Sequence, residues 1–119
     1  MKKHRVTPLE VMELEFLDRK IIFNFNMRAT TKLQEKFGDI EEAFKGKDEY
    51  EMAAVMLWAG VKDDDFTLEE AEVIVTSSVD ALVDTLTLTK DNIMKLAGES
   101  NVKKIQEEIE KALMKAKNQ

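Results

Sequence analysis

The sequence predicts an α+β fold: a mostly helical small domain with an N-terminal β-hairpin followed by about six short helices. Two observations predict this class. Near the N-terminus, apolar and polar residues alternate on both sides of a short polar break, which is the period of paired strands. From Met27 onward the apolar spacing changes to that of helices, interrupted by glycines and capping residues.

The length and composition predict one domain. The chain has 119 residues, of which 44% are hydrophobic and 35% are charged, and this is enough for one core. We expect a flexible N-terminal tip at residues 1–8 and a single domain at residues 9–119. The basic start is not followed by an apolar run, so we expect no signal peptide. With no cysteine in the chain, we expect a reducing compartment, the cytoplasm.

The hairpin is expected first along the chain. Its apolar positions are Met12, Leu14 and Phe16 before the polar break and Ile21, Phe23 and Phe25 after it. The break itself is Asp18-Arg19-Lys20, and because it contains no Asn-Gly or Asp-Gly pair, the turn type stays open. A two-stranded hairpin is marginal alone in water, so its apolar face is expected to pack on helices.

Three helices are expected within residues 27–60. Gly38 and Gly46 are expected to end the first two, because glycine is the usual residue after a helix end. Asp39 and Asp48 can each accept a hydrogen bond from a first-turn amide, and we expect them to cap the second and third helices.

The later helices follow the same logic. Thr67 and Glu70 match a capping box, in which each side chain bonds the backbone of the other residue. Further boundaries are expected at Ser77 or Ser78, at Thr89, at Gly98 and at Ser100. The last helix, 101–117, has a narrow apolar stripe and a charged back. Packing of this stripe on the domain is favoured over a role as an appended interaction helix.

Residues for catalysis or metal binding are scarce, and we expect no enzyme, no cofactor and no metal. The single histidine, His4, lies in the tip, where nothing holds it in position as a base. Zinc needs three or four nitrogen or sulfur ligands, and this chain offers one, the imidazole of His4. The run Asp63-Asp64-Asp65 lacks the alternating spacing of a calcium loop, and we interpret it as a solvated loop.

One segment is more apolar than a surface helix requires. Met52 to Val61 is apolar nearly all the way round, so it is either a central core helix or a helix with a second apolar face for a partner. It is too short to cross a membrane. Under the second interpretation the candidate protein-binding residues are Met56, Leu57, Trp58, Val61 and Phe66. Tryptophan is enriched at binding hot spots, and methionine suits adaptable surfaces.

Four segments, in this order, carry a resemblance to a known family. They are Phe23-Asn24-Phe25-Asn26, Leu33-Gln34-Glu35-Lys36-Phe37-Gly38, Met56-Leu57-Trp58-Ala59-Gly60-Val61 and Phe66-Thr67-Leu68-Glu69-Glu70. Over residues 9–97, the chain resembles the tail assembly chaperones of long-tailed bacteriophages and related prophages. The charged helix from residue 101 onward has no aligned motif.

The resemblance implies a role and no catalytic residues. Such proteins coat the long tape measure protein before the tail tube polymerises around it, and they are absent from the finished particle. It therefore implies the tape measure protein as partner, with the tail tube protein and a second copy of the chain as further candidates, in the cytoplasm of a bacterial host. The net charge of −6 makes nucleic acid a poor partner.

Other functions stay open beside this one. The chain could be a structural virion component, such as a tail completion or head–tail connector protein. An acidic mimic of nucleic acid is disfavoured, because lysines alternate with the acids along the expected helices. A small enzyme that uses a carboxylate pair is disfavoured, because it needs two acids that face each other across a cleft, and among the 24 acidic residues only a chance pair would supply them.

Overall fold

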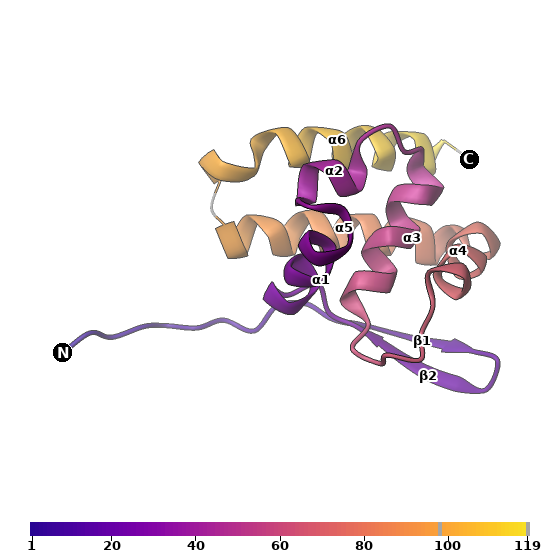
Figure 1. Cartoon of the computed structure of the whole chain (residues 1–119), viewed down its shortest axis with the longest axis horizontal. Coiled ribbons are helices and arrows are strands. Elements are labelled where there is room, and N and C mark those ends of the chain that lie inside the picture. Colours follow the sequence, from indigo (N-terminus) through magenta and orange to yellow (C-terminus); the bar gives the residue numbers. More distant parts are fainter. Residues whose placement is uncertain (98, 119) are drawn as a thin grey trace.

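The computed structural model describes residues 1–97 and 99–118. Within them the chain forms an α+β domain, as predicted, with one antiparallel hairpin followed by six helices (Figure 1). The elements are β1 (Met12–Phe16), β2 (Arg19–Phe23), α1 (Met27–Phe37), α2 (Ile40–Phe44), α3 (Glu49–Gly60), α4 (Leu68–Ser77), α5 (Val79–Ala97) and α6 (Glu99–Lys117). Residues 1–11 carry no secondary structure, and the N-terminal end of this segment extends away from the body, whereas the carbonyl of Glu10 accepts from Asn92 Nδ2 of α5 at 3.1 Å.

The hairpin turn is shorter than predicted and begins one residue earlier. Arg19 and Lys20 belong to β2, where they pair with Phe16 and with the residue before it, so the turn is made by Leu17 and Asp18 alone. Both turn residues have positive φ, 50° and 64°, as in a two-residue type I′ turn. The strand therefore includes two charged residues that were predicted to lie in the turn.

Local capping determines where three of the predicted helices begin. Asp39 accepts from the amide of Glu42 at 2.7 Å, and Asp48 forms a capping box at the start of α3. Thr67 and Glu70 form the predicted capping box of α4. These predictions are confirmed because a capping residue acts on the adjacent turn, whose sequence is known.

The predicted break at Thr89 is wrong. α5 runs without interruption from Val79 to Ala97, and Thr89 lies fully buried in its middle. Threonine can serve as a helix cap, but here it is part of a buried face, and tertiary packing keeps the helix continuous. The restart at Ser78 is confirmed, since its hydroxyl accepts from the amide of Ala81 at 3.1 Å.

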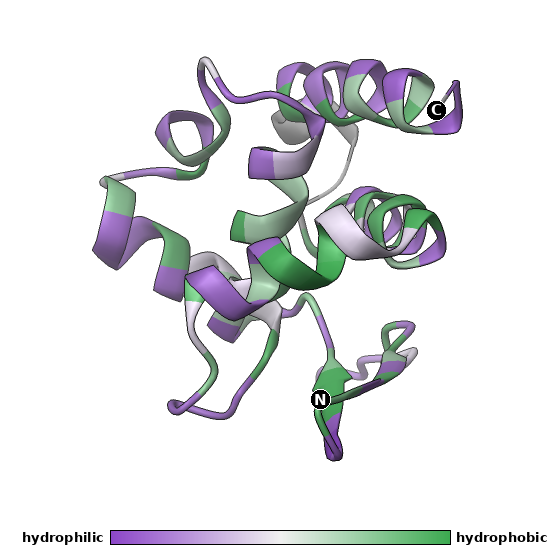
Figure 2. Ribbon diagram, turned by 90° about the vertical axis from the view of Figure 1, so that its right-hand side faces the viewer, coloured by the Kyte–Doolittle hydropathy of each residue, from purple (hydrophilic) through white to green (hydrophobic). Residues whose placement is uncertain are grey.

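α3 is the central helix of the domain. From Met52 to Gly60 every residue except Trp58 is buried, and the helix packs against α1, α2, α4, α5 and α6. Figure 2 shows hydrophobic residues gathered where the helices face one another. The apolar stretch is therefore explained by enclosure on all sides, which is the core interpretation of the two left open by the sequence.

α6 covers one side of the core and lies alongside α5 (Figure 1). Most of its described apolar stripe is buried, namely Ile109, Ala112, Leu113 and Ala116, while Ile105 is partly buried and packs on the same core. This stripe thus belongs to the core, while the charged back of the helix faces solvent. Gly98 and the side chain of Ser100, predicted as a helix stop and a helix cap, lie outside the described residues.

Candidate protein-binding cleft

The end of β2 is joined to the end of α3. The amide of Asn24 donates to the carbonyl of Gly60 at 2.9 Å, and Phe23 and Val61 form an isolated antiparallel bridge. The Phe23 ring lies against Gly60, where a side chain would collide with it. This junction fixes the hairpin relative to the helices.

Arg19 makes a second connection, from the turn end of the hairpin. Its guanidinium donates to Glu70 Oε2 at 2.6 Å and lies 3.5 Å from Asp63 Oδ2. Glu70 therefore serves the capping box of α4 with one oxygen and the hairpin with the other. Asp63 therefore stabilises both the hairpin and its own loop, since its Oδ1 atom also accepts from the amide of Asp65.

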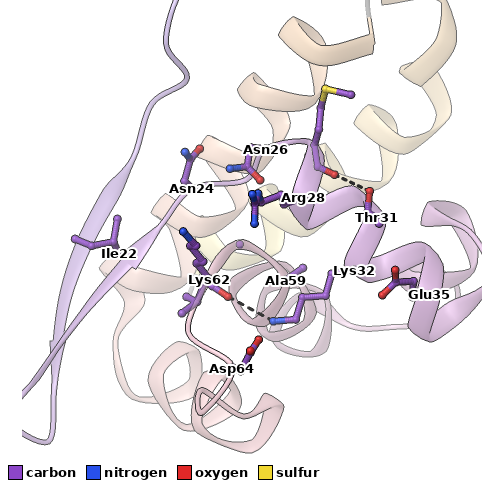
Figure 3. A pocket seen from close by; sticks show the side chains of 13 residues that line it. Ile22, Asn24, Asn26, Arg28, Thr31, Lys32, Glu35, Ala59, Lys62 and Asp64 are labelled. Carbon is purple, nitrogen blue, oxygen red and sulfur yellow. Dashed lines mark hydrogen bonds between the residues drawn. The ribbon is translucent and has the colours of Figure 1, made fainter.

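Between β2, α1 and the end of α3 lies an open cleft of about 670 Å³ (Figure 3). Its lining comes from three parts of the chain: β2 and the hairpin exit, the first three turns of α1, and the end of α3 with the segment after it. The lining residues are Ile22, Asn24, Asn26, Met27, Arg28, Thr31, Lys32, Glu35, Ala59, Gly60, Val61, Lys62 and Asp64.

Two large apolar side chains in the lining of this cleft are exposed to solvent. Ile22 is 47% exposed and Met27 is 71% exposed. Ile22 sits at an outward position of β2, opposite Glu13, whereas its neighbours Ile21 and Phe23 point into the core. An apolar edge beside polar lining is typical of a surface that receives a partner.

Lys32 ties α1 to the end of α3 inside the cleft. Its ammonium donates to the carbonyls of Trp58 at 3.0 Å and Val61 at 3.4 Å, close to the C-terminus of α3, where a cation is favoured. Burial lowers the pKa of Lys32 from 10.5, and the nearby Asp64 opposes this effect. Because the unfolded chain binds this proton more tightly, the lysine's contribution to stability rises with pH between its lowered pKa and 10.5.

Trp58 lies next to the cleft and is the one residue between Met52 and Gly60 of α3 that is not buried. The ammonium of Lys32 is 4.2 Å from the ring centroid and that of Lys36 is 5.3 Å away, both within cation–π range. Arg28, Lys32 and Lys36 follow one another at four-residue spacing along α1, so they share one face of the helix. This face is cationic in a chain whose net charge is −6.

Four of the five predicted binding residues are enclosed in the core. Met56, Leu57, Val61 and Phe66 are each at most 3% exposed, so they are not available as a docking surface. The prediction is corrected for these four residues, because other helices cover α3 and the side chain of Phe66 lies in the same core. Trp58 alone is half-exposed.

Sequence reasoning did not find the cleft. Its signals were present: an isoleucine at an outward strand position, and basic residues at spacings of four on α1. They could not be joined, because residues 22–35 and 59–64 meet only in the folded chain. The region offers apolar contact, cations and amides, which together suit binding of a polypeptide.

The described residues contain no group of three or more acidic or histidine side chains placed to hold a metal ion. Nor does any helix in this part of the chain have the length and apolarity to cross a membrane. Comparison with protein-family models, with curated proteins and with solved structures gives no match. The fold and the cleft together define a small α+β domain with an open, partly apolar, cation-lined surface.

Proposed function

We propose that this chain is a non-catalytic binding protein, a tail assembly chaperone that binds a phage tape measure protein and keeps it soluble until the tail tube assembles. Two things support the proposal. The order and spacing of the four sequence segments resemble that family. The observation that carries the binding role is the open cleft, with Ile22 and Met27 exposed at its edge.

The apolar segment from Met52 to Val61 does not supply the contact surface, because all of its side chains except that of Trp58 are buried. A protein that holds an apolar helical rod needs an apolar contact surface, and here the cleft edge and the half-exposed Trp58 supply it. It also needs an acidic exterior to stay soluble while many copies gather, and the net charge of −6 suits this. Modest affinity per copy is enough, because many sites along one rod add to strong retention.

Co-expression with a long, mostly helical tape measure protein tests the proposal. We expect the chain to raise the soluble fraction of that protein severalfold. The variant I22S/M27S is expected to lose this effect, since it removes the two apolar side chains at the cleft. V73S/V79S is the matched control, because Val73 and Val79 are similarly exposed on α4 and α5 but lie outside the cleft.

Each result has a distinct meaning. An unchanged soluble fraction with the natural chain contradicts the chaperone role. Full activity of I22S/M27S contradicts the cleft as the contact surface. Mass spectrometry of purified particles separates the chaperone from its alternative, because we propose that the chain acts in the host cytoplasm and leaves the assembly. Its presence in particles at stoichiometric amount would favour a tail completion or connector protein.

A further inference from the structure

One end of the cleft gathers cations and amides. Figure 3 shows the side chains of Arg28 and Lys62 reaching the same region as Asn24 and Asn26, from α1, from the segment after α3 and from the hairpin exit. The carboxylates of Glu35 and Asp64 lie toward the other end. The cleft is therefore polarised along its length.

The two cations at this end have no acid to neutralise them. Neither Arg28 nor Lys62 forms an ion pair with any described residue. The first turn of α1 also contains no acidic side chain, although the helix dipole favours one there. Two such cations that converge with two amide side chains at one end of a cleft, with the acids toward the other end, indicate a place for a negative group from outside.

Asn24 adds a second, independent indication. Its Oδ1 atom is buried and has no hydrogen-bond partner within the described chain. Buried polar atoms are normally bonded, and leaving one unbonded is unfavourable. Asn26 differs, because its Oδ1 accepts from the amide of Ala29 at 3.2 Å. This end of the cleft thus presents two cations without a direct acidic partner and one acceptor without an N–H donor, and a simple anion satisfies only the cations.

We propose that the cleft binds an acidic segment of a partner polypeptide. A side-chain carboxylate lies between Arg28 and Lys62, an N–H group of the segment donates to Asn24 Oδ1, and a neighbouring apolar side chain packs on Ile22 and Met27. The inference rests on the proposed function in taking the occupant to be a polypeptide. A nucleic acid fits less well, because Glu35 and Asp64 in the same cleft repel a second phosphate.

A defined probe tests this without knowledge of the partner. A short fluorescent peptide of glutamate and leucine is titrated against the chain, and a lysine–leucine peptide of equal length is the control ligand. We expect only the acidic peptide to bind, with weaker affinity as salt rises. The variant R28E/K62E is expected to lower its affinity about tenfold or more. The new glutamate in the first turn of α1 favours that helix, and circular dichroism checks that the double variant keeps the fold.

The control variant is K95E/K117E, which makes the same change in charge at exposed lysines on α5 and α6, outside the cleft. It is expected to keep affinity within about twofold. N24L, which removes the unbonded acceptor, is expected to weaken binding about threefold or more. Amide shifts in NMR spectra are expected at Ile22, Asn24 and Arg28.

Several outcomes overturn the inference. These are no binding of the acidic peptide, equal binding by R28E/K62E, equal binding of the lysine peptide, or tighter binding of a DNA oligonucleotide. Self-association of the natural chain that R28E/K62E disperses would assign the cleft to a second copy. Failure of this inference is distinct from failure of the proposed function. If the natural chain and the R28E/K62E variant keep a tape measure protein equally soluble, the result contradicts the acidic contact and leaves the chaperone role intact.

Discussion

At Gly60 the chain has no room for a β-carbon. A methyl group added there would lie 2.3 Å from Cε1 of the buried Phe23 ring. We predict that Gly60→Ala lowers the free energy of unfolding by about 1–3 kcal/mol, because overpacking outweighs the gain in helix propensity. Urea denaturation measures the change. In a Phe23→Leu background the same substitution should cost less, and an equal cost in both backgrounds would contradict the steric explanation.

The hairpin turn places two ordinary residues in the left-handed region. Leu17 has φ 50° and is 76% exposed, so it accepts backbone strain without gaining burial. We predict that replacing Leu17-Asp18 by Asn-Gly raises the free energy of unfolding by about 1–2 kcal/mol, because this pair suits a type I′ turn. Thermal denaturation checks it. Leu17→Ala keeps the strain and is expected to give no gain, so a gain from alanine would place the effect in the side chain.

On α5, two buried threonine hydroxyls lower the stability of the domain. The hydroxyls of Thr85 and Thr89 are fully buried and find no hydrogen-bond partner in the described structure. Valine has the same shape, so we predict that Thr85→Val and Thr89→Val each raise the free energy of unfolding by about 1 kcal/mol. Thr87→Val is the control on the same helix, because its hydroxyl donates to the carbonyl of Val83 at 2.8 Å. Stabilisation by the control of the same size would contradict the explanation.

The elements were predictable where their signals are local. The caps at Asp48 and Thr67 act within one turn, and the alternation of strand residues is visible in the sequence alone. Thr89 was misassigned for the opposite reason: a threonine in a buried helix and a threonine at a cap look the same without the surrounding core. The turn at Leu17 was missed because no sequence rule favours leucine at positive φ.

At the scale of the whole molecule, α6 packs against α2, α3 and α5 and buries apolar residues in the same core as they do. We predict that Ile109→Asp, which places a charge in the fully buried stripe, lowers the free energy of unfolding by about 3 kcal/mol or more in a single transition. Met114→Asp is the matched control, since Met114 is 61% exposed on the same helix and should change stability by less than about 0.5 kcal/mol. An unchanged main transition in Ile109→Asp would instead define an appended helix.

The binding surface was less accessible from sequence than the fold. The apolar run of α3 gave the strongest signal, and it reported the core, because hydrophobicity does not say which side chains are covered. The cleft depends on Ile22, Arg28 and Lys62, which are ordinary residues in sequence and acquire a common role only when β2 meets the end of α3. Of the five predicted residues, Val61 lines the cleft with its side chain buried, and Trp58 lies beside the cleft.

The enclosure of α3 also has a consequence for synthesis on the ribosome. Its covering comes partly from α1 and α2, which precede it, and partly from α4, α5 and α6, which follow it. Translation proceeds at about 5–20 residues per second, so the nascent chain presents this uncovered apolar helix for a time on the order of seconds. During that interval the uncovered helix is open to aggregation, and the hazard ends once α4, α5 and α6 have left the exit tunnel and packed on it.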